Sequence, residues 1–255
     1  MLHRFAYQLV DVFTRERFGG NPLAVFPDAQ GLDPALMQRF AFELNLSEST
    51  FVLPPDRAGC DVQVRIFTPR RELPMAGHPV VGTAFVLERE GRAADRVTFG
   101  LGVGPTPVER VLGLDGGPIW RMQQQPARFG ARVEDRAAVA RALGLAPGDL
   151  GALPIEPVST GNTFVVVELA SLDALARARL DAAAAQALAG AAGAVGLYPF
   201  VRTADGAAQA RMFAPGDSIA EDPATGSAAG PLGAFLLAHG TVAPGDDGVA
   251  RVTVA

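Results

Sequence analysis

Residues 65–69, Arg-Ile-Phe-Thr-Pro, recur in related form as residues 211–215, Arg-Met-Phe-Ala-Pro. Three further pairs repeat in the same order: Gly20-Asn21 with Gly161-Asn162, Gly77-His78 with Gly226-Ser227, and a closing Gly91 with Gly240. The second member of each pair follows the first by 141 to 149 residues. Four pairs in one order indicate an internal duplication, so we expect two similar lobes.

Each copy has the pattern of an α+β lobe. Asp33-Pro34 predicts the start of a first helix. Two segments, 78–90 and 228–239, are so apolar that helices there must be buried on nearly all sides. Alternating residues predict strands at 5–13, 49–53, 61–67, 197–202 and 208–213, with further helices at 135–143 and 172–192. We therefore expect a sheet wrapped around one central helix in each lobe.

The boundary between the lobes is predicted in the turn Leu-Asp-Gly-Gly-Pro at 114–118, which gives lobes of residues 1–116 and 117–255. Residues 97–101 and 108–112 predict a hairpin at the end of the first lobe. Residues 252–254 resemble residues 97–99, but the chain stops at Ala255. The second lobe is therefore predicted to lack a final strand.

Composition excludes several classes of function. All 22 basic residues among the 255 are arginines, so a lysine Schiff base and a P-loop are excluded. The single cysteine, Cys60, cannot form an intrachain disulfide or a four-cysteine metal site, which favours a reduced, cytoplasmic location. A net charge of -5 without a basic stripe argues against nucleic-acid binding, and no segment predicts a membrane anchor.

No cofactor or metal is expected. The three histidines have no metal-ligand spacing. The glycines at 100, 102 and 104 resemble a dinucleotide loop, but Pro105 and Pro107 follow where its helix would have to start.

The Gly-X pairs at the starts of the two apolar helices are candidate substrate-binding sites. A helix N-terminus carries unpaired N–H groups and the positive end of the helix dipole, and glycine lets a carboxylate approach closely. We therefore expect Gly77, Gly226 and Ser227 to bind a small carboxylate, in a site that both lobes share.

Differences between the copies indicate the catalytic residues. At an offset of 149 residues, Glu48 corresponds to Leu197, so only the first lobe offers a base there. Burial at the end of a sheet would raise the pKa of a glutamate toward the range in which it both takes and gives a proton. His78 and Asp222 also lack counterparts, and we expect them to support Glu48.

The motifs resemble the PhzF-like isomerases of phenazine biosynthesis. The matching blocks are Gly20-Asn21-Pro22-Leu23-Ala24-Val25, Ser47-Glu48-Ser49-Thr50-Phe51-Val52, residues 65–69 with Glu72-Leu73-Pro74-Met75-Ala76-Gly77-His78-Pro79, and Glu221-Asp222-Pro223-Ala224-Thr225-Gly226-Ser227-Ala228. The resemblance implies the diaminopimelate-epimerase-like fold, with two pseudo-twofold-related lobes, each a curved, mostly antiparallel sheet around a central helix, and the active site between them. It also implies a homodimer.

The same resemblance assigns the acid/base role to Glu48, supporting roles to His78 and Asp222, and substrate binding to Gly77, Gly226 and Ser227. It implies a cofactor-independent isomerisation by proton movement on a small cyclic or amino carboxylic acid. Related epimerases use two cysteines, where this chain has Ala76 and Thr225. The leading hypothesis is therefore an isomerase. A non-catalytic small-acid binding protein and an amino-acid racemase or epimerase are the alternatives.

Overall fold

The computed structural model describes residues 4–255 except 114–115, 204–205 and 218. They form two compact units, Met1–Gln124 and Gln125–Ala255. The sequence placed the boundary after residue 116. In the structure, strand β8 (Pro118–Met122) pairs with β7 (Gly104–Leu112), so residues 118–122 complete the first unit's sheet. Of the predicted turn at 114–118, residues 114–115 lie outside the described residues; the described part lies within the first unit, where the Gly113 N–H donates to the Gly117 carbonyl at 2.7 Å.

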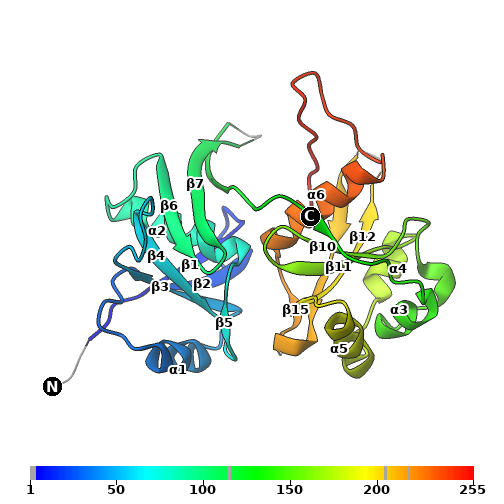
Figure 1. The fold of residues 1–255 in the computed structure, drawn as a ribbon, viewed down its shortest axis with the longest axis horizontal. Coiled ribbons are helices and arrows are strands. Elements are labelled where there is room, and N and C mark those ends of the chain that lie inside the picture. Colours follow the sequence, from blue (N-terminus) through cyan, green and yellow to red (C-terminus); the bar gives the residue numbers. More distant parts are fainter. Residues whose placement is uncertain (1–3, 114–115, 204–205, 218) are drawn as a thin grey trace. The chain divides into compact units, whose positions relative to one another are not determined.

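The first unit is an eight-stranded mixed sheet in the order β1-β2-β3-β4-β6-β7-β8, with β5 beside β4 (Figure 1). Among the pairings described in this unit, only β2/β3 and β4/β6 are parallel. The remaining strands of this unit are β1 (Gln8–Val12), β2 (Asn21–Phe26), β3 (Glu48–Leu53), β4 (Val62–Phe67), β5 (Glu72–Leu73) and β6 (Arg96–Leu101).

Two helices cover opposite faces of this sheet. Helix α2 (Gly77–Arg89) packs into an aliphatic core with strands from across the sheet, as its uniformly apolar sequence predicted. Helix α1 (Pro34–Leu44) packs against a separate aromatic cluster that contains Phe26, Phe51 and Phe67. Asp33 caps α1 through a 2.9 Å hydrogen bond from the Leu36 N–H, which confirms the predicted start.

The second unit repeats this plan with a seven-stranded sheet in the order β15-β14-β12-β11-β10-β9 and β13 beside β12. Helix α6 (Gly226–Ala238) packs on one face, and α3 (Arg136–Ala142), α4 (Leu172–Arg177) and α5 (Ala182–Ala191) share the core of the other face (Figure 1). Its strands are β9 (Arg128–Phe129), β10 (Glu156–Ser159), β11 (Thr163–Glu168), β12 (Gly196–Arg202), β13 (Ala208–Ala210), β14 (Met212–Ala214) and β15 (Ile219–Asp222).

The single helix predicted over residues 172–192 is wrong, because the structure divides it into α4 and α5. Between the two helices the chain is hydrogen-bonded to the end of α3. The Arg179 N–H donates to the Leu143 carbonyl, and the Asp181 N–H donates to the Ala142 carbonyl. Asp181 then caps α5 by accepting from the Ala184 N–H at 3.0 Å. An alanine-rich sequence gives no periodic signal for such a break.

Strand register shows that the two units are copies of one plan. Ser49 pairs with Phe67 in the first unit, and Leu197 pairs with Phe213 in the second. Because Phe67 and Phe213 occupy the same place in the repeated motif, Ser49 is the counterpart of Leu197. The counterpart of Glu48 is therefore Gly196, not Leu197 as the sequence offset suggested.

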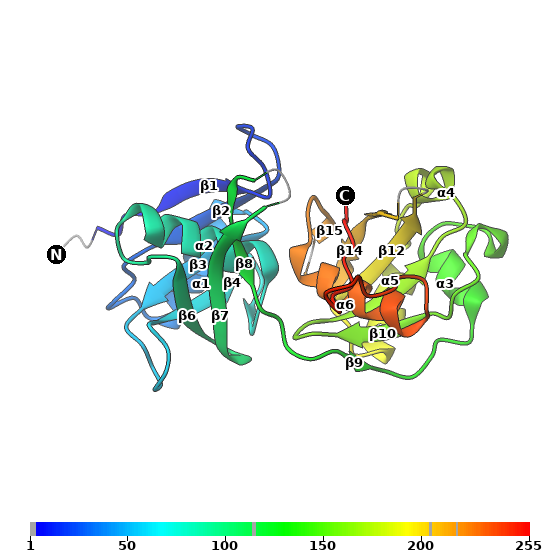
Figure 2. The same cartoon turned by 90° about the horizontal axis from the view of Figure 1, so that it is seen from above.

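The end of the chain returns to the second unit's sheet (Figure 2). Val254 forms a parallel bridge with Ala208, and the Ala255 N–H donates to the Ala208 carbonyl at 2.9 Å. In the first unit, Phe99 of β6 makes the equivalent parallel pair with Val62. Among the described residues, no helix is both long and apolar enough to cross a membrane.

Candidate active site

Glu48 and His78 lie together in the first unit. Glu48 begins β3, and His78 lies in the first turn of α2. The two side chains are 12% and 4% exposed, and the Nε2 atom of His78 is 3.5 Å from Oε2 of Glu48. The sequence predicted both residues as functional, and the structure brings them together although 30 residues separate them in the chain.

Alternation along β3 explains why Glu48 faces α2. Side chains two residues apart in a strand share a face of the sheet. Thr50 lies on the same face as Glu48 and makes a 2.8 Å hydroxyl–hydroxyl hydrogen bond with Thr83 of α2. Val52, the next residue on this face, belongs to the core that contains α2. The packing of this face of β3 against α2 thus directs the Glu48 side chain toward the start of that helix.

His78 is neutral over the physiological pH range. Burial lowers the pKa of its imidazole to about 3, because a desolvated imidazolium is unfavourable. An ionised Glu48 at 3.5 Å would act in the opposite direction, so burial is the larger effect. Nε2 is buried without a hydrogen-bond partner in the described structure. A neutral imidazole that has one open nitrogen can give or accept a hydrogen bond without adding charge.

The helices that begin at Gly77 and Gly226 differ from the other four at their N-termini. In α1, α3, α4 and α5 a side chain accepts a hydrogen bond from a first-turn N–H, the caps being Asp33, Asp135, Ser171 and Asp181. In α2 and α6 the capping positions hold Ala76 and Thr225, and neither makes a side-chain cap bond. In these two helices the capping residue therefore supplies no side-chain acceptor to the first turn.

In the second unit, Asp222, Gly226 and Ser227 lie together at the start of α6. Asp222 is the last residue of β15, and its Oδ2 accepts a hydrogen bond from the Thr225 hydroxyl. Ser227 is 5% exposed in the first turn of α6. The sequence predicted all three residues but not the contribution of Thr225, which holds the Asp222 carboxylate.

Tyr198 is a second residue that the sequence analysis missed. It lies on β12, 4% exposed, and burial raises the pKa of its phenol, with a smaller contribution from the charge of Asp222. Comparison of the copies could have indicated it, since Tyr198 replaces the buried Thr50 of the first unit. A buried phenol near a carboxylate adds a neutral hydrogen-bond donor beside Asp222.

The second unit cannot carry a base at the position of Glu48. Its counterpart Gly196 is covered by β14, and a Cβ atom at residue 196 would lie 2.0 Å from the Phe213 carbonyl oxygen. No side chain fits at that distance without moving the strand. The described residues include no group of three or more His, Cys, Asp or Glu that could hold a metal ion.

The chain matches the family model for phenazine biosynthesis-like proteins, PhzC-PhzF, over residues 10–252. It is 39% identical over 243 residues to the trans-2,3-dihydro-3-hydroxyanthranilate isomerase of Pseudomonas fluorescens, covering 92% of this chain and 81% of that protein.

Solved structures agree with this match. A phenazine biosynthesis protein of the PhzF family from Bacillus anthracis superposes with a TM-score of 0.80 at 30% identity, over 91% of this chain and 78% of that one. A hydroxyproline epimerase from Agrobacterium vitis, at 14% identity and a TM-score of 0.61 over 96% of this chain and 81% of that one, shows the shared epimerase-like α+β fold alone. The chain therefore belongs to the PhzF-like family of phenazine biosynthesis-like proteins and is an isomerase.

Proposed function

We propose that this isomerase moves a proton between two carbons of a small carboxylic acid, without a cofactor, using Glu48 as base and then as acid. The observation that carries the proposal is the buried Glu48–His78 pair at the start of the uncapped helix α2. A carboxylate at this position can take a proton from carbon, and its neighbours can bind the anion that forms.

The proposed reaction conserves every atom of the substrate. The Glu48 carboxylate removes a proton from an sp³ carbon next to a double bond, and the freed electron pair shifts the double bond by one position. Glu48, now protonated, donates a proton to the far carbon, and its carboxyl proton can exchange with solvent between the two steps. Because burial keeps His78 neutral, it can donate or accept a hydrogen bond beside Glu48 without competing as a charged acid.

We assign substrate binding to the helix starts. Gly77 permits close approach of a carboxylate to the first turn of α2, and Gly226 and Ser227 offer the equivalent turn of α6. Asp222, oriented by Thr225, is proposed to support the same reaction. The substrate of the Pseudomonas fluorescens relative, trans-2,3-dihydro-3-hydroxyanthranilate, combines a carboxylate with the required acidic carbon and is the first probe to test.

A solvent-exchange experiment tests the role of Glu48. Incubation with the probe in deuterium oxide should place deuterium at the carbon that receives the proton. Glu48→Gln keeps the size and polarity of the side chain but removes the base, so deuterium incorporation should fall by about 10³-fold or more. Thermal-shift titration should still detect probe binding to the variant.

Two other outcomes would identify other functions. Thermal stabilisation of the parent protein by small acids, with no exchange into any of them, would favour a binding protein. Inversion of an amino acid's α-carbon, measured by polarimetry, would indicate a racemase, although Ala76 and Thr225 replace the thiols that such enzymes use.

We also propose that the enzyme acts as a cytoplasmic homodimer. The proposal is supported by the family resemblance and by a composition with one cysteine in 255 residues. Light scattering coupled to size exclusion measures the mass directly, and a single species at the monomer mass would reject the dimer.

A further inference from the structure

Arg65 makes a two-point contact with Glu72 in the first unit. Its Nε and Nη2 atoms donate to the two carboxylate oxygens of Glu72 at 2.7 and 2.6 Å. The guanidinium also lies over the Phe67 ring, 5.2 Å from its centroid. This parallel fork and the stacking together hold the arginine in one orientation.

Arg211 makes the same contact with Glu221 in the second unit. Nε and Nη2 each donate to one Glu221 oxygen at 2.6 Å, and the guanidinium lies 4.9 Å from the Phe213 ring centroid. In both forks the arginine is 21% exposed and the glutamate 42%. Two copies that have diverged elsewhere have kept one arrangement of three side chains.

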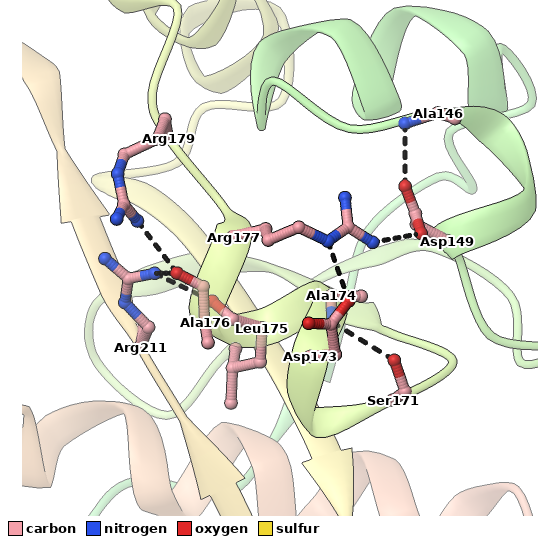
Figure 3. Close-up of polar contacts among 10 residues, drawn as sticks. All are labelled: Ala146, Asp149, Ser171, Asp173, Ala174, Leu175, Ala176, Arg177, Arg179 and Arg211. Carbon is pink, nitrogen blue, oxygen red and sulfur yellow. Dashed lines mark hydrogen bonds and ion pairs between the residues drawn. The ribbon is translucent and has the colours of Figure 1, made fainter.

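The second fork has an additional anchor. Nη1 of Arg211 donates to the Leu175 carbonyl at 2.7 Å and also reaches the Ala176 carbonyl, both near the end of α4 (Figure 3). It donates as well to the Ala178 carbonyl at 3.0 Å. The Leu175 carbonyl also accepts from the Ala178 N–H at 3.3 Å, so Arg211 supplements the backbone hydrogen bonds at the C-terminal end of α4. Arg211 thus joins α4 to Glu221.

Each fork holds the start of a segment that leads into the proposed site. Glu72 lies five residues before Gly77, and Glu221 lies five residues before Gly226. Glu221 is followed directly by Asp222, and neighbouring side chains of a strand point to opposite faces. Because the fork holds the Glu221 side chain on one face of the strand, it also holds the Asp222 side chain on the opposite face.

We propose that Arg65 and Arg211 are paired positioning residues that hold residues 72–78 and 221–227 in the conformation that the reaction needs. The inference builds on the proposed function, since it takes these two segments as parts of the site. Neither arginine is assigned a contact with substrate. Each acts through its glutamate on the backbone that ends at the helix glycine.

Hydrogen exchange of the protein alone tests the positioning without any substrate. Glu72→Gln keeps the shape of the side chain but removes the charge that holds Arg65, and Arg65→Lys removes the fork but keeps the charge. We expect amides of residues 72–78 to exchange about tenfold faster in either variant, and amides of 221–227 to do so in Arg211→Lys.

A matched control comes from a fork in the first unit whose two residues are neighbours in the chain and belong to neither segment. Arg57 donates through Nε and Nη2 to Asp56 at 3.0 and 2.7 Å. Arg57→Lys should leave exchange of residues 72–78 and 221–227 at the parent rates. Equal exchange in the parent, Arg65→Lys and Glu72→Gln proteins would overturn the proposal for the first unit, whatever the substrate proves to be.

Kinetics separate positioning from a purely structural role. We expect kcat to fall about 10- to 100-fold in Arg65→Lys and in Arg211→Lys, measured well below their melting temperatures, while KM changes less. The double variant Arg65→Glu/Glu72→Arg exchanges the positions of the arginine and the glutamate. It should restore most of the lost kcat, because Phe67 and residue 72 are cross-strand partners and an arginine at 72 can again stack on Phe67 while it pairs with the glutamate at 65.

The outcomes are distinguishable from failure of the proposed function. If the parent turns over no probe, the exchange rates still decide the positioning. If Glu48→Gln abolishes turnover but the arginine variants keep the parent kcat, the forks serve stability alone and the inference is wrong.

Discussion

Because buried His78 is neutral, we expect the stability of the protein to decrease as the pH is lowered. The pKa of His78 is about 3 in the folded protein, against 6.5 for an unperturbed imidazole. The imidazole of residue 78 binds a proton more tightly in the unfolded chain than in the folded protein. The free energy of unfolding is therefore at its full value above pH 6.5 and decreases as the pH falls from 6.5 toward 3. Each pH unit in that window costs about 1.4 kcal/mol, so stability at pH 5 should be about 2 kcal/mol lower than at pH 7.5.

The measurement uses the only tryptophan of the chain. Trp120 lies on β8 of the same unit, and its Nε1–H donates to Glu88 of α2 at 2.8 Å. Its fluorescence during urea unfolding therefore reports on the unit that contains His78. The free energy of unfolding is measured at pH 7.5 and at pH 5 for the parent and for His78→Gln. The other histidines are present in both proteins, so their contributions cancel in the comparison.

The sign of the result decides between two electrostatic descriptions. The parent should lose about 2 kcal/mol more than His78→Gln between the two pH values. If Glu48 were ionised and held His78 protonated at 3.5 Å, the parent would lose less than the variant instead. Equal losses, or a smaller loss in the parent, would refute the claim that burial dominates.

Two further predictions concern the stability of variants in the second unit. Gly196→Ala should lower the free energy of unfolding by about 3 kcal/mol, because its Cβ would meet the Phe213 carbonyl at 2.0 Å; Gly190→Ala in α5, which has open space around it, is the matched control and should be neutral or stabilising. Calorimetry showing equal effects would contradict the register assignment. Asp181→Ala removes the cap of α5 and should cost about 1 kcal/mol in urea unfolding, whereas an unchanged midpoint would mean that the 3.0 Å bond to the Ala184 N–H contributes nothing.

Duplication made most of the fold predictable. A buried helix such as α2 requires a run of apolar residues on all sides, and that run is visible in the sequence at 78–90 and again at 228–239. The predicted hairpin and the cap at Asp33 are likewise local signals. In each case the side chains that determine the element lie within the element itself.

The errors occurred where distant contacts decide the structure. Strand β8 forms because residues 118–122 pair with β7, and the glycines before it resemble a linker equally well. Helix α5 begins at Ala182, after the cap Asp181, because Arg179 and Asp181 bond to the end of α3, and no periodicity in the sequence indicates these bonds. Long-range hydrogen bonds of this kind leave no pattern in the local sequence.

The candidate site was predictable in its residues but not in its geometry. Sequence comparison identified Glu48 and His78, but their 3.5 Å separation depends on how β3 packs on α2. The offset of 149 residues matched Glu48 to Leu197, whereas strand pairing matches it to Gly196, because the spacing between equivalent elements differs by a residue from place to place. Register is set by pairing, so a drift of one residue reverses the face that a side chain occupies.

The two copies differ in whether they have room for a side chain at the position of Glu48. Both units keep an arginine fork, a five-residue approach and a helix that begins at glycine, so both can present backbone N–H groups to an anion. The first unit has room for a carboxylate at Glu48, in the parallel pair β2/β3. In the equivalent pair β11/β12 of the second unit, the Phe213 carbonyl occupies the space that a side chain at Gly196 would need. A second base at the position equivalent to Glu48 would need the second unit to open that strand. The proposed proton transfer by Glu48 alone needs no such change, so this asymmetry of the backbone favours it over a mechanism with a second base at residue 196.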